Sequence, residues 1–160
     1  MSKKKKGKEI GLAVIGCGTI GRIRAVLARD YPGVGWIGLC DIKEDIGKKL
    51  ADDIDADFFT TDYVELINRP EVTATIIATD ENLHFGPTMA AIEQGHDLFI
   101  EKPLAESVAE AESIVAKARS TNKKLVIGYI LRHHPSWIKF IEIAQTLGKP
   151  LVMRMNLNQQ

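Results

Sequence analysis

Short apolar runs alternate along the chain with longer segments in which apolar residues recur every three or four positions. The runs are continuous and rich in β-branched residues, which predicts strands buried on both faces, and the longer segments predict helices. This alternation is typical of a parallel sheet with crossover helices. We therefore expect an α/β fold with one doubly wound sheet, built from strands at 10–15, 36–40, 57–59, 73–79, 97–100 and 125–129.

The segments between these strands carry the features of amphipathic helices. The first of them is expected to bury the stripe formed by Ile20, Ile23 and Leu27 against the sheet. Ser107 and Glu110 have the spacing of a capping box, which predicts that a helix begins there. That first helix is expected to cover 20–30, and further helices are expected at 42–51, 84–94 and 135–147.

The first strand leads directly into a glycine-rich turn, Gly16-Cys17-Gly18-Thr19-Ile20-Gly21, which opens the first helix. In this context a Gly-x-Gly-x-x-Gly motif is typical of Rossmann domains, where the glycines allow a tight turn, close approach of a pyrophosphate, and close packing of helix on strand. The helix N-terminus adds free N–H groups and a partial positive charge. We expect Gly16, Gly18, Thr19, Ile20 and Gly21 to bind a dinucleotide; the alternative is a glycine turn without a ligand.

Asp41 ends the second strand about twenty residues after the last glycine. A carboxylate at this place can accept hydrogen bonds from both ribose hydroxyls of the adenosine half of the cofactor. This favours NAD over NADP, because a 2′-phosphate would meet a negative charge, although Lys43 lies close enough to weaken that preference. Asp41 could also serve as a simple cap of the helix at 42–51, and the two roles are compatible.

Glu101-Lys102-Pro103 follows the fifth strand, at the carboxyl edge where open α/β sheets bind ligands. Pro103 favours an extended backbone at Lys102, which would direct the lysine side chain into the crevice. A lysine there can stabilise the oxyanion that develops on a substrate hydroxyl as hydride leaves, and Glu101 can hold the lysine in place. By residue type alone, a surface Glu-Lys pair before a helix is the favoured interpretation.

Taken in order, these motifs resemble the N-terminal domain of the glucose-fructose oxidoreductase, inositol dehydrogenase and rhizopine-catabolism (Gfo/Idh/MocA) family. The resemblance covers about residues 9–150 and includes the glycine motif, Asp41, the segment 78–84, Glu101-Lys102-Pro103, and Gly128-Tyr129 with Arg132 and Pro135. It implies an NAD(P)-dependent dehydrogenase that acts on a sugar, cyclitol or related secondary alcohol.

The resemblance also implies roles for single residues. Thr79, Asn82 and His84 would line the nicotinamide side of the cofactor, and Asp80 stands where the family usually has proline, which loosens the turn and adds a charge near the cofactor. Lys102 would be a catalytic or substrate-positioning residue with Glu101 in support, both beside the cofactor. Arg132 would lie near the cofactor or the domain junction.

Family members carry a second, C-terminal α/β domain, whose Asp and His would act beyond Gln160. We therefore expect a flexible leader at 1–8, an NAD(P)-binding domain at 9–130, and, at 131–160, the connecting helix and first strand of a truncated substrate domain. Such a chain should bind cofactor but turn over poorly. The alternative is a standalone NAD(H)-binding module that senses redox state or regulates a partner.

The composition of the chain limits the classes of partner that we expect it to bind. The formal net charge is zero and the pI is about 6.9, which disfavours nucleic acid and anionic membranes as partners, although the lysine-rich leader leaves nucleic-acid binding as a third interpretation. Two cysteines without a Cys-x-x-Cys pair suit a reducing compartment, so a cytoplasmic protein without a metal site is expected. The alternating segment 151–157 has no partner strand after it, which predicts a homo-oligomer.

Overall fold

The computed structural model describes residues 10–149, 152 and 154. The chain divides into two compact units, the first ending at Gly128 and the second beginning at Tyr129. The leader expected at 1–8 and most of the strand expected at 151–157 fall outside the described residues. The domain boundaries expected from the sequence, and the self-association expected from that strand, stay predictions.

The first unit contains a six-stranded, entirely parallel sheet in the order β3-β2-β1-β4-β5-β6. The predicted α/β class and doubly wound sheet are therefore confirmed, and each expected strand overlaps an observed one. The strands are β1 (Ile10–Ile15), β2 (Val34–Cys40), β3 (Phe58–Thr60), β4 (Ala74–Ile77), β5 (Asp97–Ile100) and β6 (Leu125–Ile127). From β1 the chain adds β2 and β3 on one side of the sheet and then β4, β5 and β6 on the other side. This change of side between the neighbours β1 and β4 creates a crevice at their carboxyl ends.

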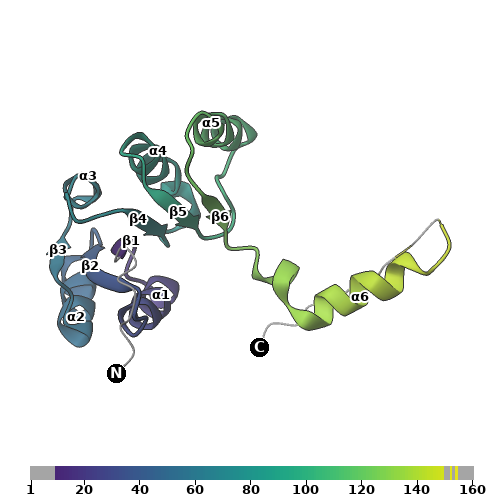
Figure 1. Ribbon diagram of the computed structural model, residues 1–160, viewed down its shortest axis with the longest axis horizontal. Helices are drawn as coiled ribbons and strands as arrows, with labels where there is room; N and C mark the ends of the chain where they lie inside the picture. Colours follow the sequence, from purple (N-terminus) through teal and green to yellow (C-terminus); the bar gives the residue numbers. More distant parts are fainter. Residues whose placement is uncertain (1–9, 150–151, 153, 155–160) are drawn as a thin grey trace, which may run out of the picture. The chain divides into compact units, whose positions relative to one another are not determined.

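Helices cover both faces of this sheet, as Figure 1 shows. One face packs against α1 (Thr19–Arg29) and α2 (Glu44–Ile54), and the other against α3 (Tyr63–Ile67), α4 (Phe85–Glu93) and α5 (Val108–Arg119). Each face has its own apolar core. The first core contains Val14, Ile37, Leu39, Ala25 and Leu50, and the second contains Ile77, Ile100, Leu66, Ile92 and Ile114. The strands are apolar on both sides because both sides are covered.

The orientation of α1 differs from the prediction. Its apolar stripe of Ile20, Ile23 and Leu27 is 45%, 48% and 64% exposed, so the expectation that this stripe is buried was wrong. Gly21 and Ala25 face the sheet instead. A Cβ atom on Gly21 would lie 1.8 Å from the carbonyl oxygen of Gly16, so the helix sits too close to the glycine turn for any side chain at this position. The buried face of α1 therefore consists of small residues, because the helix packs closely on the sheet.

The helix starts follow the capping signals only in part. At α5 the expected capping box is confirmed, because the Ser107 hydroxyl accepts from the Glu110 N–H at 3.2 Å and the Glu110 carboxylate accepts from the Ser107 N–H at 3.3 Å. By contrast, α2 begins at Glu44 with Lys43 as its N-cap. The short helix α3 was not predicted, and a 3₁₀ turn, η1 (Glu81–Leu83), precedes α4.

The second unit contains a 3₁₀ turn, η2 (Ile130–His133), and the helix α6 (Pro135–Gln145). Arg132 lies over the ring of Tyr129 at 5.8 Å, and its expected place at the cofactor stays a prediction.

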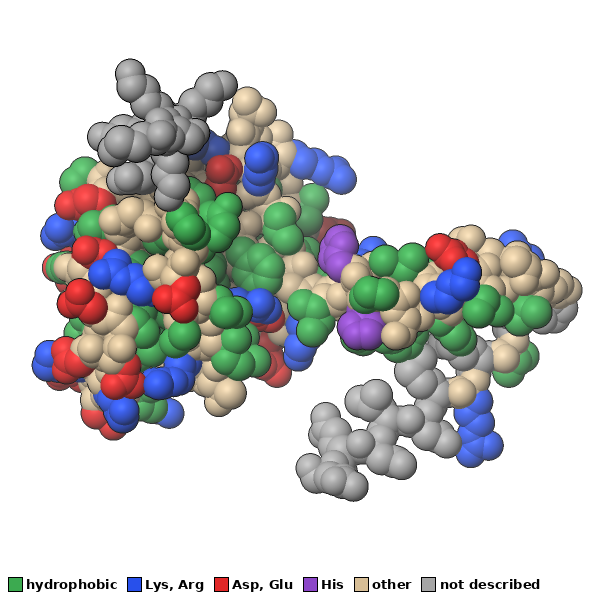
Figure 2. Space-filling model, turned by 60° about the horizontal axis from the view of Figure 1, so that its bottom comes forward, with side chains coloured by type: hydrophobic (Ala, Val, Ile, Leu, Met, Phe, Trp, Pro, Cys, Tyr) green, Lys and Arg blue, Asp and Glu red, His purple; other side chains and the backbone are tan. Residues whose placement is uncertain are grey.

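Hydrophobic side chains are exposed along α6, whereas acidic and basic side chains are interspersed on the first unit (Figure 2). None of the described helices has the length and apolar character that a membrane span requires.

Candidate functional site

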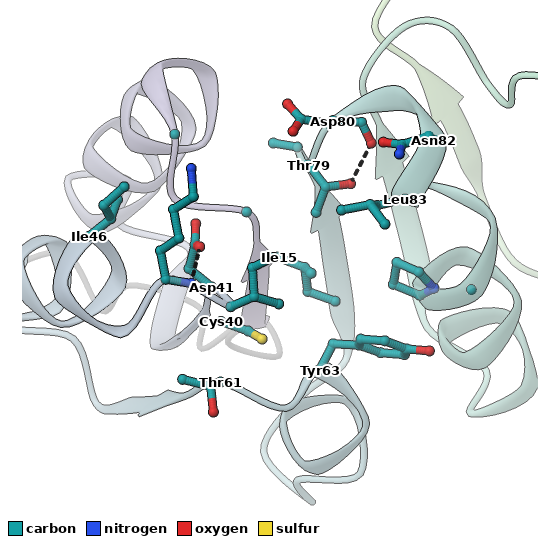
Figure 3. A pocket seen from close by; sticks show the side chains of 17 residues that line it. Ile15, Cys40, Asp41, Ile46, Thr61, Tyr63, Thr79, Asp80, Asn82 and Leu83 are labelled. Carbon is teal, nitrogen blue, oxygen red and sulfur yellow. Dashed lines mark hydrogen bonds between the residues drawn. The ribbon is translucent and has the colours of Figure 1, made fainter.

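A pocket of about 350 Å³ lies at the carboxyl edge of the sheet, where β1, β2 and β4 end. Its walls come from the glycine turn after β1, the segment after β2, the loop after β4, and α3 (Figure 3). This is the switch point at which doubly wound sheets bind ligands. The lining residues are Ile15, Gly16, Gly18, Cys40, Asp41, Ile42, Lys43, Ile46, Thr61, Tyr63, Ala78, Thr79, Asp80, Asn82, Leu83, Gly86 and Pro87.

The glycine turn is crowded on one side and open on the other. Gly16 has a φ of +92°, and a Cβ atom there would lie 2.6 Å from the carbonyl oxygen of Ala78, so only glycine fits this position. A Cβ atom on Gly18 would meet no described protein atom within 4 Å. The turn is therefore pressed against β4 at its first glycine but leaves room beside its second.

The first turn of α1 offers backbone donors to that open side. The first bond of the helix runs from the Arg22 N–H to the Gly18 carbonyl at 2.8 Å, so the preceding N–H groups of Thr19, Ile20 and Gly21 have no acceptor within the helix. The first turn contains no acidic side chain that could cap them. Unpaired N–H groups at the positive end of a helix dipole fit a diphosphate.

The carboxylate of Asp41 ties the glycine turn to the end of β2. Its Oδ2 accepts from the Cys17 N–H at 2.7 Å, and its Oδ1 accepts from the Lys43 N–H at 2.8 Å. Asp41 is not the cap of α2, because the N-cap is Lys43. Each carboxylate oxygen can accept a further hydrogen bond, so the half-buried Asp41 can still receive two ribose hydroxyls from the pocket.

The two thiols near this carboxylate are inert at neutral pH. Burial raises the pKa of both Cys17 and Cys40 to about 12, and the negative charge of Asp41 contributes to the increase in both. The Cys17 thiol lies 3.6 Å from the Cys40 carbonyl oxygen. Because the thiolate is the nucleophile, neutral and buried thiols serve here as small packing residues.

The loop after β4 forms the opposite wall of the pocket. Thr79 and Asn82 both line the pocket, and the Thr79 hydroxyl donates to the Asp80 carbonyl at 3.2 Å. Their expected contact with the nicotinamide side of a cofactor stays a prediction. Asp80 has a φ of −63°, a value that proline also adopts. Proline would therefore fit this backbone, and the visible difference from proline is the charged side chain; the expected loosening of the turn stays a prediction.

His84 lies behind this wall, 1% exposed, and does not line the pocket. Its Nδ1 is 2.7 Å from the Pro103 carbonyl oxygen, and its Nε2 is 3.2 Å from the Thr79 carbonyl oxygen. Both ring nitrogens therefore face backbone carbonyl oxygens, to which an imidazole N–H can donate. The expectation of direct cofactor contact is thus corrected: His84 links the loop after β4 to the loop that carries Lys102.

Glu101 pairs with a residue that the sequence did not reveal. Its Oε1 accepts from Arg24 Nε at 2.9 Å and Nη2 at 2.6 Å, and the guanidinium lies 4.9 Å above the Phe99 ring. A Cβ atom on Gly128 would lie 2.7 Å from Glu101 Oε2, so glycine leaves room for the carboxylate. In the sequence of α1, Arg24 lies between Gly21 and Ala25, the two residues that the helix buries. This position next to the buried face is the signal that could have identified Arg24 as a residue of the site.

Lys102 is exposed at the carboxyl edge of β5, next to Glu101. The expectation that Glu101 holds Lys102 is replaced by the Arg24 pair, and no described residue forms an ion pair with the lysine. The lysine does not line the pocket, but it is exposed to a ligand at the same edge of the sheet.

Comparison with known proteins agrees with this geometry. The model of the oxidoreductase family with an NAD-binding Rossmann fold (GFO/IDH/MocA) matches residues 10–129. The chain is 28% identical over 146 residues to the 2,7-anhydro-N-acetylneuraminate hydratase of Mediterraneibacter gnavus, covering 90% of this chain and 38% of that protein. It is 26% identical over 146 residues to the myo-inositol 2-dehydrogenase of Thermotoga maritima, covering 90% and 44%.

Among solved structures, GenD2 from gentamicin A biosynthesis in complex with NAD superposes with a TM-score of 0.79 at 26% identity, covering 88% of this chain and 40% of that one. The chain therefore spans less than half the length of these relatives. Because the family match extends through β1 to β6 and includes every wall of the pocket, the chain belongs to the Gfo/Idh/MocA oxidoreductase family and contains its NAD-binding Rossmann domain.

Proposed function

We propose that this chain is the cofactor-binding part of an NAD(P)-dependent dehydrogenase acting on a sugar, cyclitol or related secondary alcohol, with NAD as the preferred cofactor. The observation that carries the proposal is the pairing, in one pocket, of an open glycine turn with a carboxylate at the end of β2. The first fits a diphosphate, and the second fits a ribose without a 2′-phosphate.

The preference for NAD rests on Asp41. Its two oxygens are held by the Cys17 and Lys43 N–H groups, so the carboxylate cannot turn away from the pocket without breaking those bonds. A 2′-phosphate would bring a second negative charge against a fixed one, and Lys43, which also lines the pocket, would offset part of this repulsion.

The chemistry proposed for the site divides between cofactor and protein. Bound nicotinamide would supply the hydride acceptor or donor. Lys102 would donate a hydrogen bond to the substrate oxygen and stabilise the negative charge that develops there. Arg24 and Glu101 would fix the strand end from which Lys102 projects, and His84 would fix the loop on the other side of Pro103.

The proposed substrate class is supported by the names of the family relatives, which include a myo-inositol 2-dehydrogenase and a 2,7-anhydro-N-acetylneuraminate hydratase. Both names denote polyhydroxylated rings, so we propose a polyol or sugar-like substrate for the whole protein. Lys102 would meet it at the pocket edge, as one cationic donor facing a hydroxyl-rich ligand.

Calorimetric titration with NADH and NADPH tests this proposal directly. The chain should bind NADH more tightly than NADPH, and Asp41→Asn should lower the ratio of the NADPH to the NADH dissociation constant by about tenfold or more, because hydrogen bonds to a charged group are worth about 1.5–3 kcal/mol. Asp45→Asn, on the exposed first turn of α2, is the matched control and should leave the ratio unchanged.

The ratio separates selectivity from damage to the glycine turn, which would weaken both cofactors equally. Failure of the unaltered chain to bind either dinucleotide at millimolar concentration would refute the proposed cofactor site.

A further inference from the structure

Asp80 places a negative charge in the wall of the pocket formed by the loop after β4. It lines the pocket beside Thr79 and Asn82, and Figure 3 shows Asp80 and Asn82 together at this loop, away from Asp41. The side chain is exposed to the pocket and to solvent. The pocket thus has one carboxylate at the end of β2 and another in the loop after β4.

The two carboxylates differ in how they are bonded. Asp41 accepts hydrogen bonds from two backbone N–H groups. Around Asp80, the Thr79 hydroxyl and the Leu83 N–H both donate to the backbone carbonyl, whereas within residues 10–149 the carboxylate has neither an ion-pair partner nor a hydrogen-bond donor. The charge of Asp80 is therefore not compensated locally.

The position of this charge matters if the pocket holds a dinucleotide, so any role of Asp80 in binding rests on the proposed function. In a sheet of order 3-2-1-4-5-6 a dinucleotide lies across the switch point between β1 and β4. With the adenosine ribose at Asp41, the nicotinamide half lies on the β4 side, where Asp80 stands. The oxidised nicotinamide ring carries a positive charge, and the reduced ring is neutral.

We infer that Asp80 sets the selectivity of this site for oxidation state, favouring NAD⁺ over NADH. The carboxylate attracts the oxidised ring and has no comparable interaction with the reduced one. Its repulsion of the diphosphate is the same in both forms, so that contribution cancels in the ratio of the two dissociation constants. Asp80 is thus a specificity residue for the state of the cofactor, while Asp41 acts on the 2′ position.

The size of the effect can be calculated from Coulomb's law. At a separation of about 6–10 Å in a dielectric close to that of water, one unit charge changes a binding constant for another by about two- to threefold. Salt should reduce the effect, because the screening length falls to about 3 Å at 1 M ionic strength.

The test is the ratio of the NADH to the NAD⁺ dissociation constant, measured by calorimetric titration of the full chain at low salt. Asp80→Asn should lower this ratio by about two- to threefold, and Asp80→Lys should lower it further in the same direction. Glu81→Gln removes the adjacent carboxylate, which does not line the pocket, and should change the ratio less than Asp80→Asn does. Added salt should shrink the difference between Asp80→Asn and the unaltered chain.

The outcomes are distinct. Loss of both cofactor forms to the same degree in Asp80→Asn and Asp80→Lys, or an unchanged ratio in both variants, would overturn the role of the charge while leaving the cofactor site intact. If the unaltered chain binds neither NAD⁺ nor NADH, the proposed function itself fails, and the inference fails with it.

Discussion

Polar side chains that bond to the backbone hold the loops of this site together. Asp41 accepts from the N–H groups of Cys17 and Lys43, and the ring of His84 lies between the carbonyl oxygens of Thr79 and Pro103. Each links two segments of the site that are separate in the sequence. A substitution at either position should therefore displace a loop as well as remove a side chain, so variants need a stability measurement beside each binding measurement.

His96 provides a pH dependence of stability away from the pocket. It is buried beside Thr75, with Nδ1 3.0 Å from the threonine hydroxyl, and burial, followed by the charge of Lys123, lowers its pKa below 6.5. The unfolded chain therefore binds a proton more readily than the native chain. The free energy of unfolding should be unaffected by His96 above about pH 6.5 and should fall as the pH drops below it.

Urea unfolding at about pH 7.5 and about pH 5.5, on either side of the ordinary histidine pKa, measures this contribution. His96→Gln, which keeps a polar group for Thr75, should lose part of the fall in stability between the two pH values. Equal falls in the variant and the unaltered chain would show that His96 does not contribute.

The Arg24–Glu101 pair joins helix α1, which begins at the glycine turn, to the end of β5, from which Lys102 projects. Its side chains are 29% and 14% exposed, so removing one partner leaves a largely buried charge unpaired. We expect Arg24→Gln or Glu101→Gln to lower the free energy of unfolding by about 1–3 kcal/mol, and the double variant to lose less than the sum.

A double-mutant cycle measured by urea unfolding checks this pair. The exposed i,i+4 pair Lys48–Asp52 is the control and should show a smaller coupling energy. Additive effects of Arg24→Gln and Glu101→Gln would mean that the two side chains do not stabilise each other.

The sequence predicts where the strands and helices lie better than it predicts which of their faces are buried. Strands β1 and β5 have the predicted bounds, because continuous apolar runs between turns have few other uses. The stripe of Ile20, Ile23 and Leu27 was misassigned, because hydrophobicity alone does not show that α1 packs closely enough to require Gly21 and Ala25. Helix α3 has only five residues, too few for a clear helical period.

The candidate site was predictable where one local motif forms part of the pocket. The glycine turn and Asp41 line the pocket as the spacing indicates, since both follow directly from their strands. The partners of His84 and Glu101 were not predicted, and Arg24 was not singled out at all, because the paired residues are distant in sequence; Arg24 and Glu101 are separated by 77 positions. Tyr63 was missed as a pocket residue because it belongs to the unpredicted helix α3.

As a whole, the first unit gathers its candidate functional groups at one edge of the sheet. All six strands are parallel, so the loops after β1, β2, β4 and β5 emerge together, and the glycine turn, Asp41, Asp80 and Lys102 all belong to these loops. The rest of the unit is two apolar cores that hold the strands in register. Binding of a dinucleotide across this edge should stabilise the native state of the whole unit.

Thermal unfolding with and without NADH, in the unaltered chain and in Gly18→Ala, tests the diphosphate site most directly. A Cβ atom on Gly18 meets no described protein atom within 4 Å, so the variant should unfold at the same temperature as the unaltered chain without NADH. At about 100 times its dissociation constant, NADH should stabilise the unaltered chain by about 2.7 kcal/mol, and Gly148→Ala, another open glycine, equally. Gly18→Ala should show little of this gain; an equal gain would contradict binding at the glycine turn.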